Sequence, residues 1–408
     1  MTVVEAEADS ATETEKSTPC PACGGSDVRV FYRVENVPTN SCILLETEAE
    51  AKAYPTGRIA LGVCSGCGFM FNTAFVPELA EYSGRYEETQ SFSPTFNRFH
   101  KQMAERLIEQ YGLRSKTVLE IGCGKGEFLM LLAELGDITG IGIDPGVKPD
   151  RISGPAAERM TFIPDFYSEK YGHHEVDFLA CKMTLEHIPD VAIFLKTVRR
   201  GLGDQLDTIV FFQVPEALRI LRDCAFEDIY YEHCSYFTPA SLARVFRLAG
   251  FDVINTTIEY DDQYLTIEAR PRAEGQPAQE PNENEDSLAE VLSLVASFEE
   301  RTVALMERLQ DRVRGTVADG KTVALWGSGS KAVSFMTSCD LADCVSAVTD
   351  VNPYRHGRFI PKTGHRIVAP DELKTVKPDL VVIMNRIYEP EIREDLARLG
   401  LHPEIVAL

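Results

Sequence analysis

The sequence predicts an α/β protein built from a small metal-binding module followed by two unequal doubly wound domains. Two Cys-x-x-Cys pairs near the N-terminus indicate the module, which we place at residues 19–78. Residues 79–270 and 287–408 each alternate short β-branched strands with amphipathic helical runs, the pattern of parallel sheets covered by helices. A chain of 408 residues is long enough for more than one buried core.

Charge and composition exclude several classes of partner. The chain has 41 Lys and Arg against 63 Asp and Glu, a net charge of −22, so it repels polyanions and we expect no nucleic-acid partner. No apolar run reaches membrane-spanning length, and the acidic residues 1–18 predict a disordered tail without an export signal, so no membrane partner is expected. Eleven cysteines, an odd number, favour metal binding in a reducing cytoplasm over disulfides. The assembly state stays open, with a monomer as the default.

The cysteine pairs Cys20/Cys23 and Cys64/Cys67 are each followed by glycine, as in zinc-knuckle turns. Four thiolates complete a closed tetrahedral set, which predicts a structural Zn(II) ion with no position left for substrate. The alternative is a thioredoxin-like redox pair. Neither pair opens a helix within a strand–helix–strand unit, so the zinc interpretation is favoured.

A strand running into a glycine-rich turn carries the first ligand-binding signal. Glu120 ends the strand, and the turn holds Gly122, Cys123 and Gly124, where missing side chains let a ligand approach the backbone. Asp144 ends the next strand 24 residues after Glu120, in position to hold two ribose hydroxyls. The G-x-G-x-G spacing does not fit the G-x-G-x-x-G pattern of dinucleotide-binding folds.

Two histidine segments follow the later strands of the central domain. His187 lies in a Glu-His-Ile-Pro-Asp loop, and Tyr231, Glu232 and His233 are consecutive in the second segment. Histidine titrates near neutral pH, so it can remove a proton from carbon beside a carbonyl when an adjacent acid or phenol fixes its tautomer. The sequence leaves open which histidine is the base.

After an acidic, proline-containing linker at residues 271–286, apolar residues recur at intervals of three and four from Leu288 to Phe298, which predicts one long helix. A second strand–helix alternation follows it. Its first loop, at residues 327–332, is rich in glycine and serine and ends in Lys331-Ala332.

The glycine turn resembles the E-x-G-x-G-x-G motif of class I S-adenosylmethionine-dependent methyltransferases. The resemblance implies a Rossmann-like central domain with S-adenosylmethionine lying over Gly122 and Gly124. It also implies that Glu120 lies near the methionine end of the cosubstrate and that Asp144 clamps the ribose. By the same resemblance, the adenine lies beside the residues after the third strand, which are Asp165 and Phe166.

The order of the parts resembles the zinc-containing sugar C-methyltransferases of antibiotic biosynthesis over residues 20–408. That family methylates carbon 3 of nucleotide-linked 4-keto-6-deoxysugars, so the resemblance implies such a ketosugar as the small-molecule substrate and a Rossmann-like C-terminal domain. It implies that Lys331, from the glycine–serine loop, and Arg358, from the segment starting Asp350-Val-Asn-Pro, hold the phosphates. In this segment Arg355 stands where the family has lysine.

The resulting hypothesis is methylation of carbon next to a ketone. His233, oriented by Glu232 and assisted by Tyr231 or His187, removes the α-proton, and the enolate attacks the sulfonium methyl group. Two tyrosines between the module and the core either line the substrate pocket or pack a connector, and these are Tyr82 and Tyr86. The alternatives are C-, O- or N-methylation of a non-sugar metabolite and, more remotely, a noncatalytic nucleotide-binding scaffold.

Overall fold

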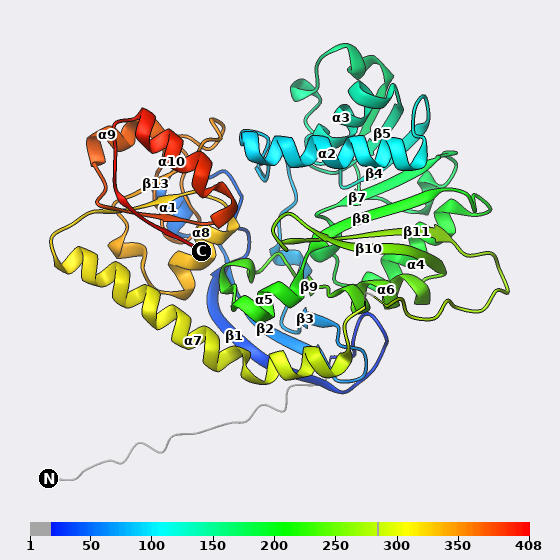
Figure 1. Cartoon of the computed structure of the whole chain (residues 1–408), viewed down its shortest axis with the longest axis horizontal. Helices are drawn as coiled ribbons and strands as arrows, with labels where there is room; N and C mark the ends of the chain where they lie inside the picture. The colour runs from blue at the N-terminus through cyan, green and yellow to red at the C-terminus, as the bar shows by residue number, and fades with distance from the viewer. Residues whose placement is uncertain (1–17, 284) are drawn as a thin grey trace, which may run out of the picture.

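Three sheets make up the protein in a computed structural model that describes residues 18–283 and 285–408. The expected N-terminal tail falls, except for its last residue, outside the described residues. In Figure 1 the central domain is on the right, the C-terminal domain is on the left, and the N-terminal strands lie below, beside the long helix α7.

The N-terminal sheet is antiparallel and has the order β1-β2-β3-β9. Its first three strands are β1 (Val28–Pro38), β2 (Thr56–Cys64) and β3 (Met70–Asn72), with the short helix α1 (Glu48–Lys52) between β1 and β2. The fourth strand, β9 (Ser235–Tyr236), comes from the segment directly after His233. The sheet of the predicted module is therefore completed by the central part of the chain.

The central sheet has the order β10-β11-β8-β7-β4-β5-β6. Its strands are β4 (Thr117–Ile121), β5 (Thr139–Ile143), β6 (Met160–Ile163), β7 (Phe178–Lys182), β8 (Ile209–Pro215), β10 (Phe251–Glu259) and β11 (Tyr264–Pro271). Strands β4 to β8 are parallel, as predicted, whereas β10 and β11 form an antiparallel hairpin. Four residues join these two strands, and such a short connection can only reverse the chain direction. The expectation of a wholly parallel sheet is wrong for this edge.

Helices cover both faces of the central sheet. These are α2 (Pro94–Tyr111), α3 (Glu127–Gly136), α4 (Val191–Leu202) and α6 (Pro239–Leu248), whereas α5 (Ala217–Asp223) belongs to the apolar cluster of the N-terminal sheet. In β4, Val118 belongs to the apolar cluster with α2 and α3, while its neighbour Leu119 belongs to the cluster with α4 and α6. Successive residues of a strand point to opposite faces of the sheet, so the continuous apolar run of β4 contributes to the hydrophobic core on each face.

The linker and the long helix lead into the C-terminal domain. Helix α7 (Leu288–Ala318) starts at Ser287, whose side chain accepts from the Glu290 backbone, and it confirms the predicted helix. The C-terminal sheet is wholly parallel, with the order β14-β13-β12-β15-β16. Its elements are β12 (Val323–Trp326), α8 (Ser330–Ser338), β13 (Ala347–Thr349), β14 (Ile367–Val368), α9 (Leu373–Val376), β15 (Leu380–Ile383), α10 (Glu389–Arg398) and β16 (Glu404–Ala407).

One apolar cluster joins the N-terminal sheet to the C-terminal domain. It contains Phe31 of β1, Leu221 of α5, Phe298 of α7 and Leu325 of β12, so these elements share a buried core. Burial of such large side chains favours a fixed arrangement of the parts. Within the described part of the chain, every helix is too short or too polar to cross a bilayer.

Candidate active site

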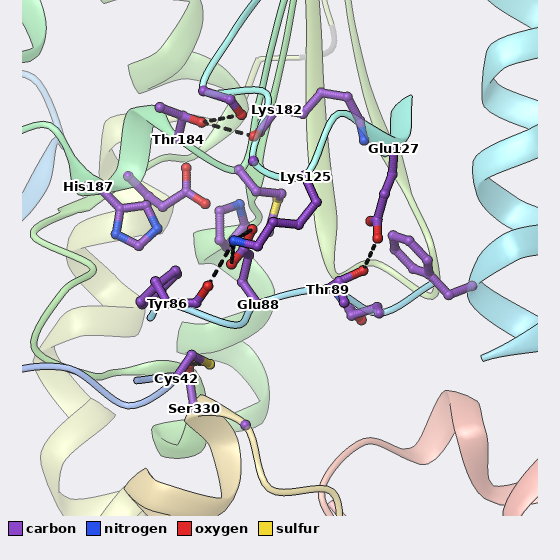
Figure 2. A pocket seen from close by; sticks show the side chains of 18 of the residues that line it. Cys42, Tyr86, Glu88, Thr89, Lys125, Glu127, Lys182, Thr184, His187 and Ser330 are labelled. Carbon is purple, nitrogen blue, oxygen red and sulfur yellow. Dashed lines mark hydrogen bonds and ion pairs between the residues drawn. The ribbon is translucent and has the colours of Figure 1, made fainter. Parts of the chain in front are cut away.

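A cavity of about 580 Å³ lies between the central and C-terminal domains. It is lined at the carboxyl ends of strands in both parallel sheets, including Ile121 of β4 and Trp326 of β12, where doubly wound folds bind ligands. Figure 2 shows Thr184 and Lys182 across this space from Cys42 and Ser330. The cavity therefore joins the glycine turn to the loops of the C-terminal domain.

The glycine turn lines this cavity in a conformation that needs glycine. Gly122 has φ +67°, and an added Cβ would lie 2.1 Å from the Thr184 hydroxyl oxygen. Gly124 has φ +53°, and its backbone N–H donates to Asp144 Oδ2 at 3.0 Å. Asp144 also accepts from Gly146, and burial raises the pKa of the Asp144 carboxyl. The turn and Asp144 are thus joined by hydrogen bonds beside the cavity, where the sequence predicts that the cosubstrate binds. Cys123 is buried in the same turn.

Replacing Gly122 by alanine is expected to lower the free energy of unfolding by about 2–4 kcal/mol, because a left-handed backbone and the clash with Thr184 both add cost. Gly112→Ala is the matched control. Gly112 has a similar φ of +61°, but its Cβ would meet nothing within 4 Å, so only the backbone strain remains. Urea unfolding of both variants measures the difference, and equal losses would contradict the close approach of Thr184.

Glu120, which is buried, and Lys182, which is partly buried, lie at one end of the cavity and interact electrostatically. Glu120 is 3% exposed, burial raises its pKa to about 7, and its Oε2 atom has no hydrogen-bond partner among the described residues. Lys182 donates to His100 Nε2 at 2.8 Å and lies 4.3 Å from the centre of the Phe128 ring. Burial lowers the pKa of Lys182 to about 8 and that of His100 to about 2, so His100 is a neutral acceptor. Lys182 belongs to none of the predicted site motifs, although a lysine that ends an apolar strand is a signal for a site residue.

Asp165 and Phe166 follow β6 and line the cavity. The Asp165 carboxylate accepts from the Tyr171 hydroxyl at 2.6 Å and pairs with Lys170, and Phe166 is 64% exposed. These two residues stay the predicted adenine neighbours.

His187 and His233 lie together in the cavity wall, with ring centres 4.9 Å apart. The hydroxyl of Tyr230 is 2.8 Å from His233 Nε2. His187 donates from Nδ1 to the backbone oxygen of Glu232 at 2.9 Å, and the Tyr82 hydroxyl is 3.2 Å from the same nitrogen. Burial lowers the pKa of His187 to about 4 and that of His233 well below its usual range. Both imidazoles are therefore neutral and able to accept a proton.

Two neighbours in this segment do not lie where the sequence analysis expected them. The Glu232 carboxylate accepts from the backbone N–H of Ser41 at 2.8 Å and from its hydroxyl, so it does not orient His233. The Tyr231 hydroxyl accepts from the Val76 backbone at 2.9 Å, and the ring is fully buried outside the cavity lining. The phenol beside His233 is Tyr230, one residue earlier. Adjacent residues in this turn point in different directions, which spacing alone does not reveal.

Glu186, the residue before His187, was also missed as a site residue. Its side chain lines the cavity at 1% exposure, and Oε1 is 4.0 Å from His233 Nε2. Neither carboxyl oxygen has a hydrogen-bond partner in the described part of the chain. Burial raises the pKa of Glu186 to about 8. A buried polar group without partners is costly, so this carboxyl is a candidate for contact with a ligand.

The predicted substrate residues separate into two groups. Tyr82, Tyr86 and Lys331 line the cavity, and Lys331 Nζ pairs with Asp228 Oδ2 at 2.7 Å. Arg358 instead pairs with Glu46 outside the lining, which corrects its expected place at the phosphates.

Two other arginines, Arg219 and Arg355, line the cavity. Arg219 of α5 lines the cavity, donates to the same oxygen of Asp228 as Lys331, and has a buried Nε without a partner among the described residues. Arg355 also lines the cavity and donates to the backbone oxygens of Ser328 and Glu87.

The four cysteines of the N-terminal module come together. The sulfur atoms of Cys20 and Cys67 are 3.7 Å apart, as are those of Cys23 and Cys64, and all four lie within 4.8 Å of one another. A tetrahedral zinc ion with bonds of about 2.3 Å places its sulfur ligands about 3.8 Å apart. The donor set and its spacing fit zinc.

Two family models match the two α/β domains of the chain. A methyltransferase domain family matches residues 96–256, and a C-methyltransferase C-terminal domain family matches residues 267–401. Two solved methyltransferases have weaker similarity. The 1,6-didemethyltoxoflavin-N1-methyltransferase of Burkholderia thailandensis is 18% identical, with 43% of this chain and 79% of that one covered and a TM-score of 0.32. The magnesium protoporphyrin IX methyltransferase of Synechocystis PCC 6803 is 16% identical, with 44% and 84% covered and a TM-score of 0.33.

The two domain matches and the class I fold define an S-adenosylmethionine-dependent C-methyltransferase. One relative that is similar to this chain over most of its length is C-methyltransferase NovU of Streptomyces niveus. It is 26% identical over 394 residues, which cover 91% of this chain and 90% of NovU. The ubiquinone biosynthesis O-methyltransferase of Actinobacillus pleuropneumoniae serotype 5b (strain L20) is 32% identical, but over only 25% of this chain and 46% of its own length.

Proposed function

We propose that this C-methyltransferase acts in natural-product biosynthesis on carbon 3 of a nucleotide-linked 4-keto-6-deoxysugar. The observation that carries the proposal is the single cavity joining the glycine turn, the His187–His233 pair and the loops of the C-terminal domain. A small acceptor alone would need only the central domain. A cavity that continues to a second parallel sheet suits an acceptor with a nucleotide attached.

Cationic groups at the C-terminal end of the cavity support a phosphate-containing handle. Lys331 of α8 and Arg219 of α5 come from different domains and share one anion, Asp228. Both side chains line the cavity, and the buried Nε of Arg219 has no partner among the described residues, so these cations are placed to bind a diphosphate. Arg355 adds a third, buried cation in the lining. We assign Arg219 and Arg355 to the role expected for Arg358.

The neutral Tyr230–His233 pair supports carbon deprotonation. The ketone makes the neighbouring C–H acidic enough for an imidazole, whereas an ordinary sugar C–H is not. We propose that the α-proton passes to this pair and ends on the imidazole of His233. His187, fixed by the Glu232 backbone oxygen, packs against the ring of His233 and keeps water out. When bound, S-adenosylmethionine supplies the methyl group as a sulfonium, and we propose that Glu120, the glycine turn, Asp144 and the Asp165–Phe166 segment bind it.

We also propose that Cys20, Cys23, Cys64 and Cys67 hold a structural zinc ion. All four sulfur ligands come from the protein, so no position is open for substrate and the ion takes no part in the chemistry. The eleven cysteines all lie in the described residues and form no disulfide there, which supports a reducing, cytoplasmic location.

A hydrogen-exchange experiment tests the proposed function. Incubation of a 4-keto-6-deoxysugar nucleotide with the enzyme in heavy water, without the methyl donor, is expected to give deuterium at carbon 3. Addition of S-adenosylmethionine is then expected to give a product methylated at that carbon. A product methylated on oxygen or nitrogen without prior exchange would contradict the proposal. Failure to bind S-adenosylmethionine in calorimetry would indicate a scaffold.

A further inference from the structure

We infer that Glu186 is a further catalytic residue, a neutral carboxylic acid that donates a hydrogen bond to the ketone oxygen of the substrate. This role rests on the proposed deprotonation next to a ketone, because the donor stabilises the enolate oxygen that the deprotonation creates. It adds an acid to the histidine base and assigns a function to a side chain that has no structural role in the described contacts.

The first support is that the Glu186 carboxyl is buried without a partner. The side chain is 1% exposed, and both its oxygen atoms lack a hydrogen-bond partner among the described residues. Glu216 shows the contrast, because it is equally buried but its oxygens accept from the backbone of Leu218 and Arg219. A buried carboxyl without a hydrogen-bond partner lowers the free energy of unfolding by about 1–3 kcal/mol or more. Its presence in a cavity wall therefore indicates that it contacts a bound ligand.

The second support is the distance between the acid and the base. Glu186 Oε1 lies 4.0 Å from His233 Nε2, and both residues line the cavity. The hydrogen on an α-carbon and the oxygen of the neighbouring carbonyl lie closer to each other than this, so an acid and a base that contact one each can be separated by such a distance. One ketone can therefore direct its C–H bond to the Tyr230–His233 pair and its oxygen to Glu186 at the same time.

The surroundings of Glu186 keep it protonated near neutral pH. Burial raises its pKa to about 8. The titratable groups that face it are neutral or proton-bearing: His187 and His233 have lowered pKa values, and burial raises those of the nearby thiols and phenols, which are Cys181, Cys234, Tyr82, Tyr230 and Tyr264. Desolvation by burial is the largest cause of this pKa shift, and it outweighs the opposing backbone hydrogen bond of Glu186 itself. A neutral acid in an apolar site is a strong donor to a developing oxyanion.

The electrons and protons of the step balance. The C–H bond breaks, its proton goes to the Tyr230–His233 pair, and its electron pair forms the enolate, whose oxygen shares the proton of Glu186. As the new carbon–carbon bond forms, the carbonyl is restored and the methyl–sulfur bond breaks with its electron pair left on sulfur. Glu186 keeps its proton at the end, so no other reactant is needed.

Two variants test the inference with carbon-3 exchange and methyl transfer measured between pH 6 and 9.5. Glu186→Ala is expected to lower both rates by about 10²- to 10³-fold, the usual effect of losing an oxyanion donor. Glu186→Gln keeps an N–H donor and is expected to stay within about tenfold of the wild type. The wild-type rate should fall as pH rises through about 8, because the active form is the protonated acid; the Gln variant should lack this alkaline decline.

The controls separate this role from folding and from the proposed function. Calorimetry should show S-adenosylmethionine affinity within about twofold of wild type in both variants, which checks that they fold. Glu216→Gln is a matched control, because burial raises the pKa of Glu216 to about 7 but its side chain does not line the cavity, so the alkaline decline should persist.

Three outcomes would overturn the role of Glu186. These are wild-type exchange in the Ala variant, an unchanged alkaline decline in the Gln variant, and a requirement for an added divalent cation that depends on Glu186. Absence of carbon-3 exchange in the wild type would instead overturn the proposed function, and this role with it.

Discussion

His233→Ala is expected to reduce carbon-3 exchange and methyl transfer by at least about 10³-fold while S-adenosylmethionine affinity changes less than twofold. His233 is the proposed final acceptor of the proton, and loss of a general base typically lowers the rate about 10²- to 10⁴-fold. Because His233 is only 5% exposed, water cannot readily replace it as the base. The glycine turn and Asp144 make none of their hydrogen bonds with His233, so the cosubstrate region should be unaffected.

Exchange measured by proton NMR, together with calorimetry for the cosubstrate, checks this result. Tyr230→Phe keeps the ring but removes the hydroxyl 2.8 Å from Nε2, so a smaller loss is expected. Tyr231→Phe is the matched control in the same segment, because the Tyr231 hydroxyl bonds to the Val76 backbone outside the cavity and its loss should leave the pH profile unchanged. A His233→Ala enzyme that still exchanges would assign the base to His187.

The glycine turn was predictable because its chemistry is local. Gly122, Gly124 and Asp144 belong to one strand–turn–helix–strand unit, in which residue type and spacing determine the geometry. The four cysteines were predictable for a similar reason, since each pair forms one turn and only the meeting of two pairs is long-range. The structure brings these residues together in the expected groups.

Side-chain directions in the histidine segment were not predictable from spacing. Residues 230–233 form an irregular turn without the period of a helix or strand, so the sequence could not tell whether Tyr230 or Tyr231 faces the cavity. The direction is decided by tertiary contacts: Tyr231 packs against Phe75, and Glu232 bonds to Ser41. Both partners lie more than 150 positions away in the chain.

The missed charged residues share a cause. Lys182 ends an apolar strand and Glu186 follows it, and a charged residue at such a position is expected in a solvated loop unless the layer that packs over it is known. Helix α2 and the Tyr82–Tyr86 region supply that layer, which buries Glu186 and partly buries Lys182. Arg219 is similar, because only the docking of α8 places Lys331 on the same Asp228. Long-range packing, not residue type, assigns these positions to the cavity.

Loss of the proposed zinc ion is expected to reduce activity through the N-terminal sheet rather than through the cosubstrate. Cys64 ends β2, Val63 pairs with Met70 of β3, and Met70 pairs with Tyr236 of β9, three residues after His233. The metal site is therefore connected by strand pairing to the segment that carries the base. An ion bound at a thousandfold excess over its Kd stabilises the folded state by about 4 kcal/mol.

Cys64→Ser should therefore lower the free energy of unfolding by about 4 kcal/mol and reduce kcat more than it weakens S-adenosylmethionine binding, which depends on a turn in a different sheet. Zinc content by atomic absorption, urea unfolding and calorimetry on the same samples measure the three effects. Cys344→Ser is the matched control, because Cys344 is a half-buried free thiol outside the cluster. This variant should retain one zinc ion and wild-type stability. A Cys64→Ser protein with full stability and kcat would show that strand pairing positions His233 without help from the metal.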